Sequence, residues 1–230
     1  MFSVRACSGA YERRARVRET YSGMRVVTAA DRVDVERITR EAEIRVAIDF
    51  GAPREPGLST SIAFFDHMLE MLGWYADVAV DATYAHTTFR LTHVVCEDVG
   101  LALGAAAAAM VRERIAGGVE STGFGHGIMD EARALAHVSF EGRSNHLIAR
   151  DAAGSRDSHV EDMLSADLVA FFEGFAQGGR CTVHLRLEQG IDPHHTWEAG
   201  FRAFARALRE CWRENPRRAG RTAGVKGTLD

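Results

Sequence analysis

Two segments in distant parts of the chain combine histidine and glutamate at the same spacing. His194 and Glu198 are four residues apart, and His93 and Glu97 repeat this spacing in the first half of the chain. In a helix, residues four apart lie on one face, whereas the residue adjacent to the first points roughly 100° away. Such a helix can offer a His/Glu pair to one metal ion and the adjacent His195 to another.

Five of the ten histidines fall at matching places in the two parts of the chain. Imidazole nitrogens together with carboxylates suit Mn, Fe, Zn or Ni, and no cysteine pair favours a softer site. A single histidine would be explained better by a surface or core position, but a duplicated set of five histidines and two glutamates favours metal binding. The predicted metal ligands are His67, His93, Glu97, His184, His194, His195 and Glu198.

The composition indicates an ordinary globular protein, with 46% hydrophobic and 26% charged residues. The net charge of −4 argues against a nucleic-acid partner, because no basic excess is available to neutralise phosphates. Four cysteines are scattered without a C-x-x-C pair, as in reduced cytosolic proteins. No apolar run reaches the ~18–20 residues that span a membrane. We therefore expect a cytoplasmic protein without a membrane or nucleic-acid partner.

The first thirty residues differ in composition from the rest. Residues 5–25 contain six arginines and only two acidic residues. An organellar transit segment has such a composition and stays an alternative. We favour a disordered extension over residues 1–30, with Met24 as an alternative start. Residues 31–115 and 116–230 are then predicted to be two similar halves of one compact domain.

Apolar periodicity predicts the elements that must position the histidines. Alternating apolar residues predict strands at 43–50, 78–84, 135–140, 146–150 and 181–187. Helical spacing predicts helices at 62–74 and 163–176, and a helix carrying each His/Glu pair. The glycine-rich stretch 117–127 matches neither a P-loop nor a Rossmann turn and is predicted to be a loop.

The order helix, strand and His/Glu segment occurs twice. Residues 64–67 correspond to 171–174, and residues 78–80 correspond to 183–185. This order predicts an internal duplication, in which each half is a small sheet with two helices on one face.

Four motifs of the chain resemble those of the imidazoleglycerol-phosphate dehydratase family. They are Phe-Phe-Asp-His-Met-Leu at 64–69, Glu-Asp-Val-Gly-Leu-Ala-Leu-Gly at 97–104, Met-Asp-Glu-Ala at 129–132 and His-His-x-x-Glu at 194–198. The resemblance implies an α+β fold made by tandem duplication of a ribosomal-protein-S5-domain-2-like unit. It also implies a Mn-dependent dehydratase of histidine biosynthesis, with trimers that assemble into a shell of about two dozen subunits.

The resemblance further implies two Mn sites in each active site. One would use His93, Glu97, His184 and His195. The other would use His67, His194, Glu198 and a histidine at a position that is Val94 here. Ligands of one metal ion could come from different subunits. Val94 therefore marks one site that lacks a ligand.

The reaction implied by the resemblance is metal-assisted removal of water from imidazoleglycerol phosphate. Both imidazole nitrogens of the substrate would bind metal, which stabilises ring deprotonation and a diazafulvene-like intermediate. Glu41 matches the family's glutamate for proton transfer at the carbon acid. Glu131 is a second catalytic candidate, for which a structural role stays equally open.

The predicted phosphate site departs further from the family. Arg143 and Lys226 match two of the family's phosphate-binding cations, and Lys226 is the only lysine of the chain. Gly123 replaces an arginine, and Gly224 and Val225 replace a serine-containing stretch. A site with two cations would still hold a phosphate, but more weakly.

These departures leave alternatives open within one family. The chain could be the histidine-pathway dehydratase, or a divergent paralogue that acts on a different azole alcohol. It could also be a catalytically inactive member kept as a structural or regulatory subunit. Metal analysis separates these cases, because the full enzyme should hold about two Mn per subunit and a chain with one impaired site about one.

Overall fold

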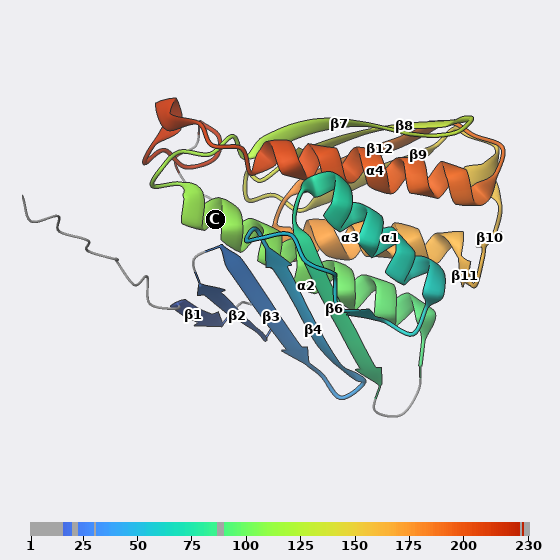
Figure 1. Cartoon of the computed structure of the whole chain (residues 1–230), viewed down its shortest axis with the longest axis horizontal. Coiled ribbons are helices and arrows are strands. Elements are labelled where there is room, and N and C mark those ends of the chain that lie inside the picture. The colour runs from blue at the N-terminus through green and yellow to red at the C-terminus, as the bar shows by residue number, and fades with distance from the viewer. Residues whose placement is uncertain (1–15, 20–22, 30, 87–89, 226, 228–230) are drawn as a thin grey trace, which may run out of the picture.

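The structure is a computed structural model that describes residues 16–19, 23–29, 31–86, 90–225 and 227. Two β-sheets enclose a double layer of helices (Figure 1). α2 packs on the first sheet and α4 on the second, and within the helical layer α2 contacts α3 while α1 contacts α4. The helices are α1 (Ala63–Ala76), α2 (Thr92–Arg114), α3 (Ser165–Gly179) and α4 (Pro193–Cys211).

The second sheet repeats the strand order of four adjacent strands of the first sheet. The first runs β1-β2-β3-β4-β6-β5 and the second runs β7-β8-β12-β9. In both, an antiparallel hairpin is followed by an antiparallel strand that pairs in parallel with the edge strand, β6 with β5 and β12 with β9. This repeated order confirms the predicted α+β fold made by tandem duplication.

The strand bounds agree with the predicted strands within a few residues. The first sheet contains β1 (Arg16–Glu19), β2 (Met24–Ala29), β3 (Arg32–Ile38), β4 (Ala42–Asp49), β5 (Leu58–Ser59) and β6 (Ala79–His86). The second contains β7 (Thr122–Met129), β8 (Ala132–Ser139), β9 (Asn145–Arg150) and β12 (Thr182–Gln189). A separate hairpin is formed by β10 (His159–Val160) and β11 (Met163–Leu164). The predicted boundary at 115/116 lies between α2 and β7 and stays a prediction.

The predicted disordered extension over residues 1–30 is wrong for β1 and β2. β2 pairs antiparallel with β3 along its whole length, and Met24 and Val26 are buried on the face that α2 covers. The arginine-rich composition hid the alternation of apolar residues that makes this strand. Residues 1–15, where the transit-segment alternative also falls, lie outside the described residues.

The predicted glycine-rich loop is in fact strand β7 over most of its length. Gly123, Gly125 and Gly127 alternate along β7 and face α4, where a Cβ at each position would lie 1.9–2.0 Å from a backbone carbonyl oxygen of the helix. Without side chains on this face, the strand and the helix pack main chain against main chain. The glycines therefore mark close packing, and not the flexibility of a loop.

We expect Gly125→Ala to destabilise the protein strongly. The new Cβ would lie 2.0 Å from Ala203 O and 2.7 Å from Ala207 N, so the strand and the helix must move apart. Overpacking of this kind costs about 3 kcal/mol or more, which lowers the Tm by roughly 6–12 °C. Thermal unfolding followed by circular dichroism measures the shift. Gly117→Ala is the control, because its Cβ would meet only Arg114 O at 3.8 Å; equal Tm values for the two variants would contradict the argument.

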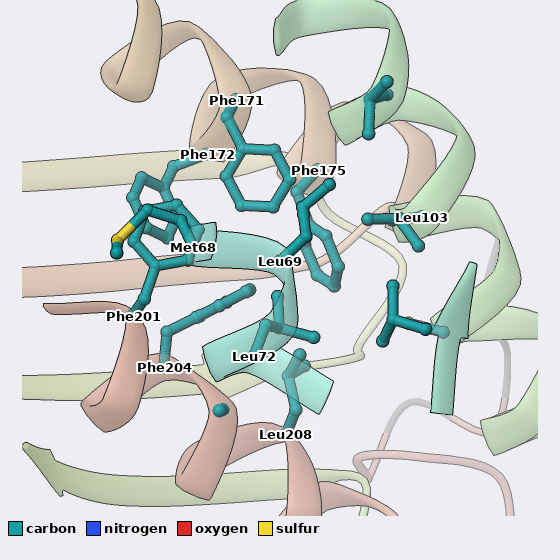
Figure 2. Packing of buried hydrophobic residues seen from close by; sticks show 14 of the residues in the cluster. Met68, Leu69, Leu72, Leu103, Phe171, Phe172, Phe175, Phe201, Phe204 and Leu208 are labelled. Atoms are coloured by element: carbon teal, nitrogen blue, oxygen red, sulfur yellow. The ribbon is translucent and has the colours of Figure 1, made fainter. Parts of the chain in front are cut away.

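The part of the core that lies between the helices contains a cluster of aromatic rings (Figure 2). Phe171, Phe172 and Phe175 of α3 interlock with Phe201 and Phe204 of α4, with ring centroids 4.9–6.4 Å apart. Met68, Leu69 and Leu72 of α1 close the cluster. This packing joins α1, α3 and α4 through one cluster of buried side chains.

α2 is long and apolar enough to span a membrane by length and composition alone. Of its most apolar window, 78% is buried inside the protein. Gly100 and Gly104 bring its backbone against α3, where a Cβ would lie 2.3 Å from Phe171 O and 2.1 Å from Phe175 O. Its burial between a sheet and another helix is that of a core helix.

Candidate active site

The second His/Glu pair lies at the start of α4. Asp192 caps this helix, and its carboxylate accepts hydrogen bonds from the backbone N–H of His194 at 2.7 Å and of His195 at 3.4 Å. Pro193 occupies the first helical position, where a missing N–H leaves no bond unmade. His194 and Glu198 therefore share one helical face, as their spacing predicts.

His67, His194 and Glu198 form a compact cluster where α1 meets α4. Glu198 Oε2 lies 3.4 Å from His67 Nε2 and 3.3 Å from His194 Nε2. The ligand atoms of the three residues lie within 4.8 Å of one another. Two imidazole nitrogens and one carboxylate oxygen make a donor set that fits Mn, Fe or Zn. The cluster can therefore hold a metal ion, with ligands from both halves of the chain.

Glu198 is 2% exposed and is held by an arginine one turn further along α4. Its Oε1 accepts a hydrogen bond from Arg202, which also donates to the carbonyl of Ile128 at 2.7 Å and lies over the Tyr75 ring. Burial raises the pKa of Glu198, but Arg202 and His67 outweigh it, so the pKa is lowered overall. The carboxylate is therefore ionised near neutral pH, and Oε2 is left to face the two imidazoles.

The first His/Glu pair lies in the first turns of α2. His93 Nε2 is 3.7 Å from Glu97 Oε2, and His93 Nδ1 is 3.6 Å from Asp167 Oδ1 on α3. Both members of the pair are exposed, at 61% and 38% of their side chains. Asp167 is buried, and among the described residues its Oδ2 has no hydrogen-bond partner. The pair thus offers two potential ligands at the surface of the chain and is not a complete metal site by itself.

His195 is held by Glu131, the second predicted catalytic glutamate. Glu131 Oε2 lies 2.8 Å from His195 Nδ1, while Oε1 accepts the backbone N–H of Asp192 at 3.0 Å and of Ile191 at 3.1 Å. The N–H of Asp192, followed by His195, lowers the pKa of Glu131 to about 2. A carboxylate this acidic is a poor base near neutral pH. The sequence left a catalytic and a structural role open for Glu131, and these contacts favour the structural role.

We expect His195 to titrate above its ordinary pKa in the metal-free protein. The hydrogen bond with Glu131 is the main cause that raises the pKa of His195. Below pH 6.5, the ordinary pKa of histidine, His195 is protonated and its contact with Glu131 contributes fully to the stability of the fold. This contribution is lost as the pH rises through the higher pKa that His195 has in the folded state. Imidazole NMR titration gives the midpoint. Glu131→Gln should return it toward 6.5, whereas Asp130→Asn, 3.9 Å from Nε2, should leave most of the shift; an unmoved midpoint in Glu131→Gln contradicts the assignment.

His184 occupies the outer face of the second sheet, away from the helices. Its neighbours Val183 and Leu185 are buried, whereas His184 between them is exposed. It lines a surface pocket of about 610 Å³ together with His137, its partner in β8. α4, which carries His194, His195 and Glu198, packs on the opposite face of this sheet (Figure 1). One chain alone therefore does not bring His184 to the other predicted ligands.

Glu41, the predicted proton carrier, lies in the turn between β3 and β4, close to the first His/Glu pair. Burial raises the pKa of Asp98, and the negative charge of Glu41 adds to that rise while Arg37 opposes it. Asp98 directly follows Glu97 on α2. Glu41 is thus within electrostatic reach of the helical turn that carries a predicted metal ligand.

Arg143, one of the two predicted phosphate-binding residues, lies at one end of the second sheet. Arg143 is exposed in the turn between β8 and β9, 3.3 Å from Glu141. The C-terminal segment reaches the same turn, because a Cβ at Gly224 would lie 3.2 Å from Glu141 Cδ. Lys226 lies outside the described residues. Gly123 faces α4, where even a Cβ would lie 1.9 Å from a backbone carbonyl, so an arginine does not fit there in this packing.

Sequence reasoning missed several charged residues that contact the predicted ligands, among them Arg202, Asp167 and Glu161. Arg202 follows Glu198 by four residues on α4, so helical spacing could have revealed it. Asp167 and Glu161 reach His93 and His194 only through tertiary packing, and Glu161 Oε1 lies 2.9 Å from His194 Nδ1. No local pattern in the sequence signals these two contacts.

The fold and the cluster define a class, namely duplicated α+β proteins that can hold a metal ion between helices of their two halves. The sequence model of the imidazoleglycerol-phosphate dehydratase family matches residues 60–208. The chain belongs to this family, and the resemblance inferred from its motifs is confirmed. It is accordingly a dehydratase, or hydro-lyase, of histidine biosynthesis.

Relatives of known name cover nearly the whole chain. The imidazoleglycerol-phosphate dehydratase of Ralstonia nicotianae is 33% identical over 202 residues, which are 86% of this chain and 98% of the relative. The enzyme of the same name from Methylibium petroleiphilum is 35% identical over 206 residues, which are 88% and 100% of the two chains. A crystal structure of IGPD from Pyrococcus furiosus has a TM-score of 0.68 and 26% identity, and covers 84% of this chain and 98% of that one. The solved structure confirms the fold.

Proposed function

We propose that this protein dehydrates imidazoleglycerol phosphate in a Mn-dependent reaction. The cluster of His67, His194 and Glu198 carries the metal part of this proposal, because its three ligand atoms converge within 4.8 Å. Family membership supplies the reaction class and a small phosphorylated imidazole as substrate. A Mn ion held by these residues would supply Lewis acidity toward the imidazole ring of the substrate.

A second metal site belongs to the same proposal and requires a second subunit. Three of its ligands are His93 and Glu97 of α2 and His195 of α4, whose ligand atoms do not converge among the described residues of one chain. The fourth, His184, comes from a neighbouring chain, since within one chain it faces the other way from α2 and α4. The first site, with His67, His194 and Glu198, would take its fourth ligand from a neighbouring subunit, and Val94 occupies the position of that ligand. Each site is then completed by contact between chains.

The remaining site residues act on the proton and the phosphate of the substrate. Glu41 moves the proton of the carbon acid, which its exposure and its proximity to α2 allow. Arg143 and Lys226 bind the phosphate by charge-assisted hydrogen bonds. Glu131 orients His195 and stays charged throughout, in keeping with its low pKa.

Self-association into trimers, and of trimers into a shell of about two dozen subunits, completes the proposal. The outer face of the second sheet supports it, because Phe124, Ile128 and Leu147 are 40%, 61% and 56% exposed on the strands that surround His184. Exposed apolar side chains clustered on one face are typical of protein interfaces. The proposed partners are therefore copies of this chain, and we place the assembly in the cytoplasm.

The test is incubation of the purified, Mn-loaded protein with imidazoleglycerol phosphate, followed by detection of imidazole acetol phosphate. We expect turnover that is lost on chelation and restored by Mn. Metal analysis in parallel gives the number of ions per subunit. An assembled, Mn-loaded protein without turnover would overturn the assigned substrate, and would favour the inactive structural member instead.

A divergent paralogue acting on another azole alcohol is the second candidate. One observation favours it, namely that the backbone of α4 leaves no room for any side chain at Gly123. A phosphate site that lacks this cation tolerates a substrate with less charge. Comparison of kcat/KM for imidazoleglycerol phosphate and for the dephosphorylated imidazole alcohol separates the two candidates, because only the paralogue should prefer the latter.

A further inference from the structure

A tight turn between β10 and β11 lies beside the metal cluster. It consists of Glu161 and Asp162, and it is anchored by Val160 and Met163, which pair with each other and are buried. Glu161 has a φ of +49°, in the left-handed region that residues other than glycine rarely adopt. Glycine would fit this backbone conformation better, yet the position carries the side chain of a glutamate.

Asp162 caps α1 from the other half of the chain. Its carboxylate accepts hydrogen bonds from the backbone N–H of Ala63 at 2.8 Å and of Phe64 at 3.1 Å. Ile62, the residue at the cap position itself, offers no side-chain hydrogen bond. His67 follows one turn later, so Asp162 fixes the end of the helix that presents it. The Phe64 ring in turn packs edge-on against His194, with centroids 5.0 Å apart.

Glu161 contacts the cluster through His194, at the ring nitrogen that does not face Glu198. Its Oε1 lies 2.9 Å from His194 Nδ1, while His194 Nε2 lies 3.3 Å from Glu198 Oε2. A neutral imidazole has one N–H and one lone pair. When Nδ1–H donates to Glu161, the lone pair is on Nε2 and faces His67 and Glu198.

We infer that the Glu161–Asp162 turn is a positioning element for the metal cluster. Glu161 fixes the tautomer and the ring orientation of His194, and Asp162 fixes the start of α1 and so the place of His67. This inference rests on the proposed function for the identity of the metal. Carboxylates that hold the second nitrogen of a metal-binding histidine commonly act in this way.

Glu161→Gly separates positioning from folding. Glycine adopts positive φ freely, so the variant should unfold at the same temperature as the wild-type protein, or higher. In the metal-free protein, the imidazole ¹⁵N resonances of His194 should change from the Nδ1–H tautomer to a mixture. Titration with Mn²⁺ alone should give an affinity about 10–100-fold weaker at this site.

The matched control is Glu70→Ala, because Glu70 is also close to the cluster but lies 3.7 Å from His67 Nδ1 and is half exposed. It should bind Mn²⁺ within about twofold of the wild-type protein. Asp162→Asn keeps one of the two accepting oxygens and should bind Mn²⁺ more tightly than Asp162→Ala, which keeps neither.

A wild-type tautomer together with wild-type Mn²⁺ affinity in Glu161→Gly would overturn the inference. Failure of the proposed function looks different. If the wild-type protein bound no Mn²⁺, the metal assignment would fail, while the His194 tautomer in Glu161→Gly would still decide whether the turn positions this ring.

Discussion

Glu198→Gln should remove the metal ion from the cluster of His67, His194 and Glu198 and abolish dehydration. The substitution keeps the shape of the side chain but replaces the charged ligand oxygen with a neutral amide. Four-ligand metal sites in small zinc domains gain about 10–16 kcal/mol on binding, so one ligand contributes roughly 3 kcal/mol, or about 100-fold in affinity. Mn²⁺ titration of the purified variant measures this loss.

Arg202 makes the same substitution costly for the fold. With Glu198 neutral, the half-buried guanidinium loses its counter-charge, which costs about 3 kcal/mol of unfolding free energy. His67→Asn is therefore the second variant, since His67 is more exposed and leaves the Arg202 pair intact. Both variants should lose metal, but only Glu198→Gln should also lower the Tm. Normal Mn²⁺ binding in both would show that the cluster is not the metal site.

Val94→His should raise both the metal content and the activity of the protein. Val94 follows His93 in the first turn of α2 and is only partly buried, so an imidazole can replace it without disturbing the core. A fourth ligand should increase Mn²⁺ affinity at the incomplete site by roughly 100-fold. The metal content should then rise from about one toward about two ions per subunit.

Val94→Ala is the control, because it changes the size of the side chain without adding a ligand. It should bind Mn²⁺ as the wild-type protein does. Metal analysis after gel filtration, combined with the dehydration assay, reads out the comparison. If Val94→His bound no additional metal in an assembled protein, the position would not face a metal site, and the paralogue with its own ligand arrangement would gain support.

The metal cluster could be predicted because its signal is local. The i, i+4 spacing of His194 and Glu198 fixes their relative positions once α4 forms, and the family resemblance grouped His67 with them. The geometry of α4 then places two of the three ligands without any knowledge of tertiary structure. His184 shows the limit of this reasoning, since its residue type was recognised but its direction depends on which face of β12 the helices cover.

Other parts of the fold depend on contacts that a local pattern does not contain. β7 was missed because alternating glycines look like a loop, although here they allow α4 to pack directly on the strand. β2 was missed because its apolar residues are masked by neighbouring arginines, and its burial comes from α2 in another part of the chain. The carboxylates of Glu161 and Asp167 contact histidines that belong to other elements of the fold, so spacing along the sequence does not predict these contacts.

The glycine contacts between α2 and α3 have a consequence for how this protein can vary. Gly100 and Gly104 meet the carbonyls of Phe171 and Phe175, and Gly174 meets the carbonyl of Glu97 itself. The distance between these two helices is thus set by main-chain atoms, which every sequence shares. Exchange of Phe175 or Phe204 for another apolar residue should by contrast act mainly on stability. A single methyl group at one of these glycines would instead shift a predicted metal ligand together with its helix.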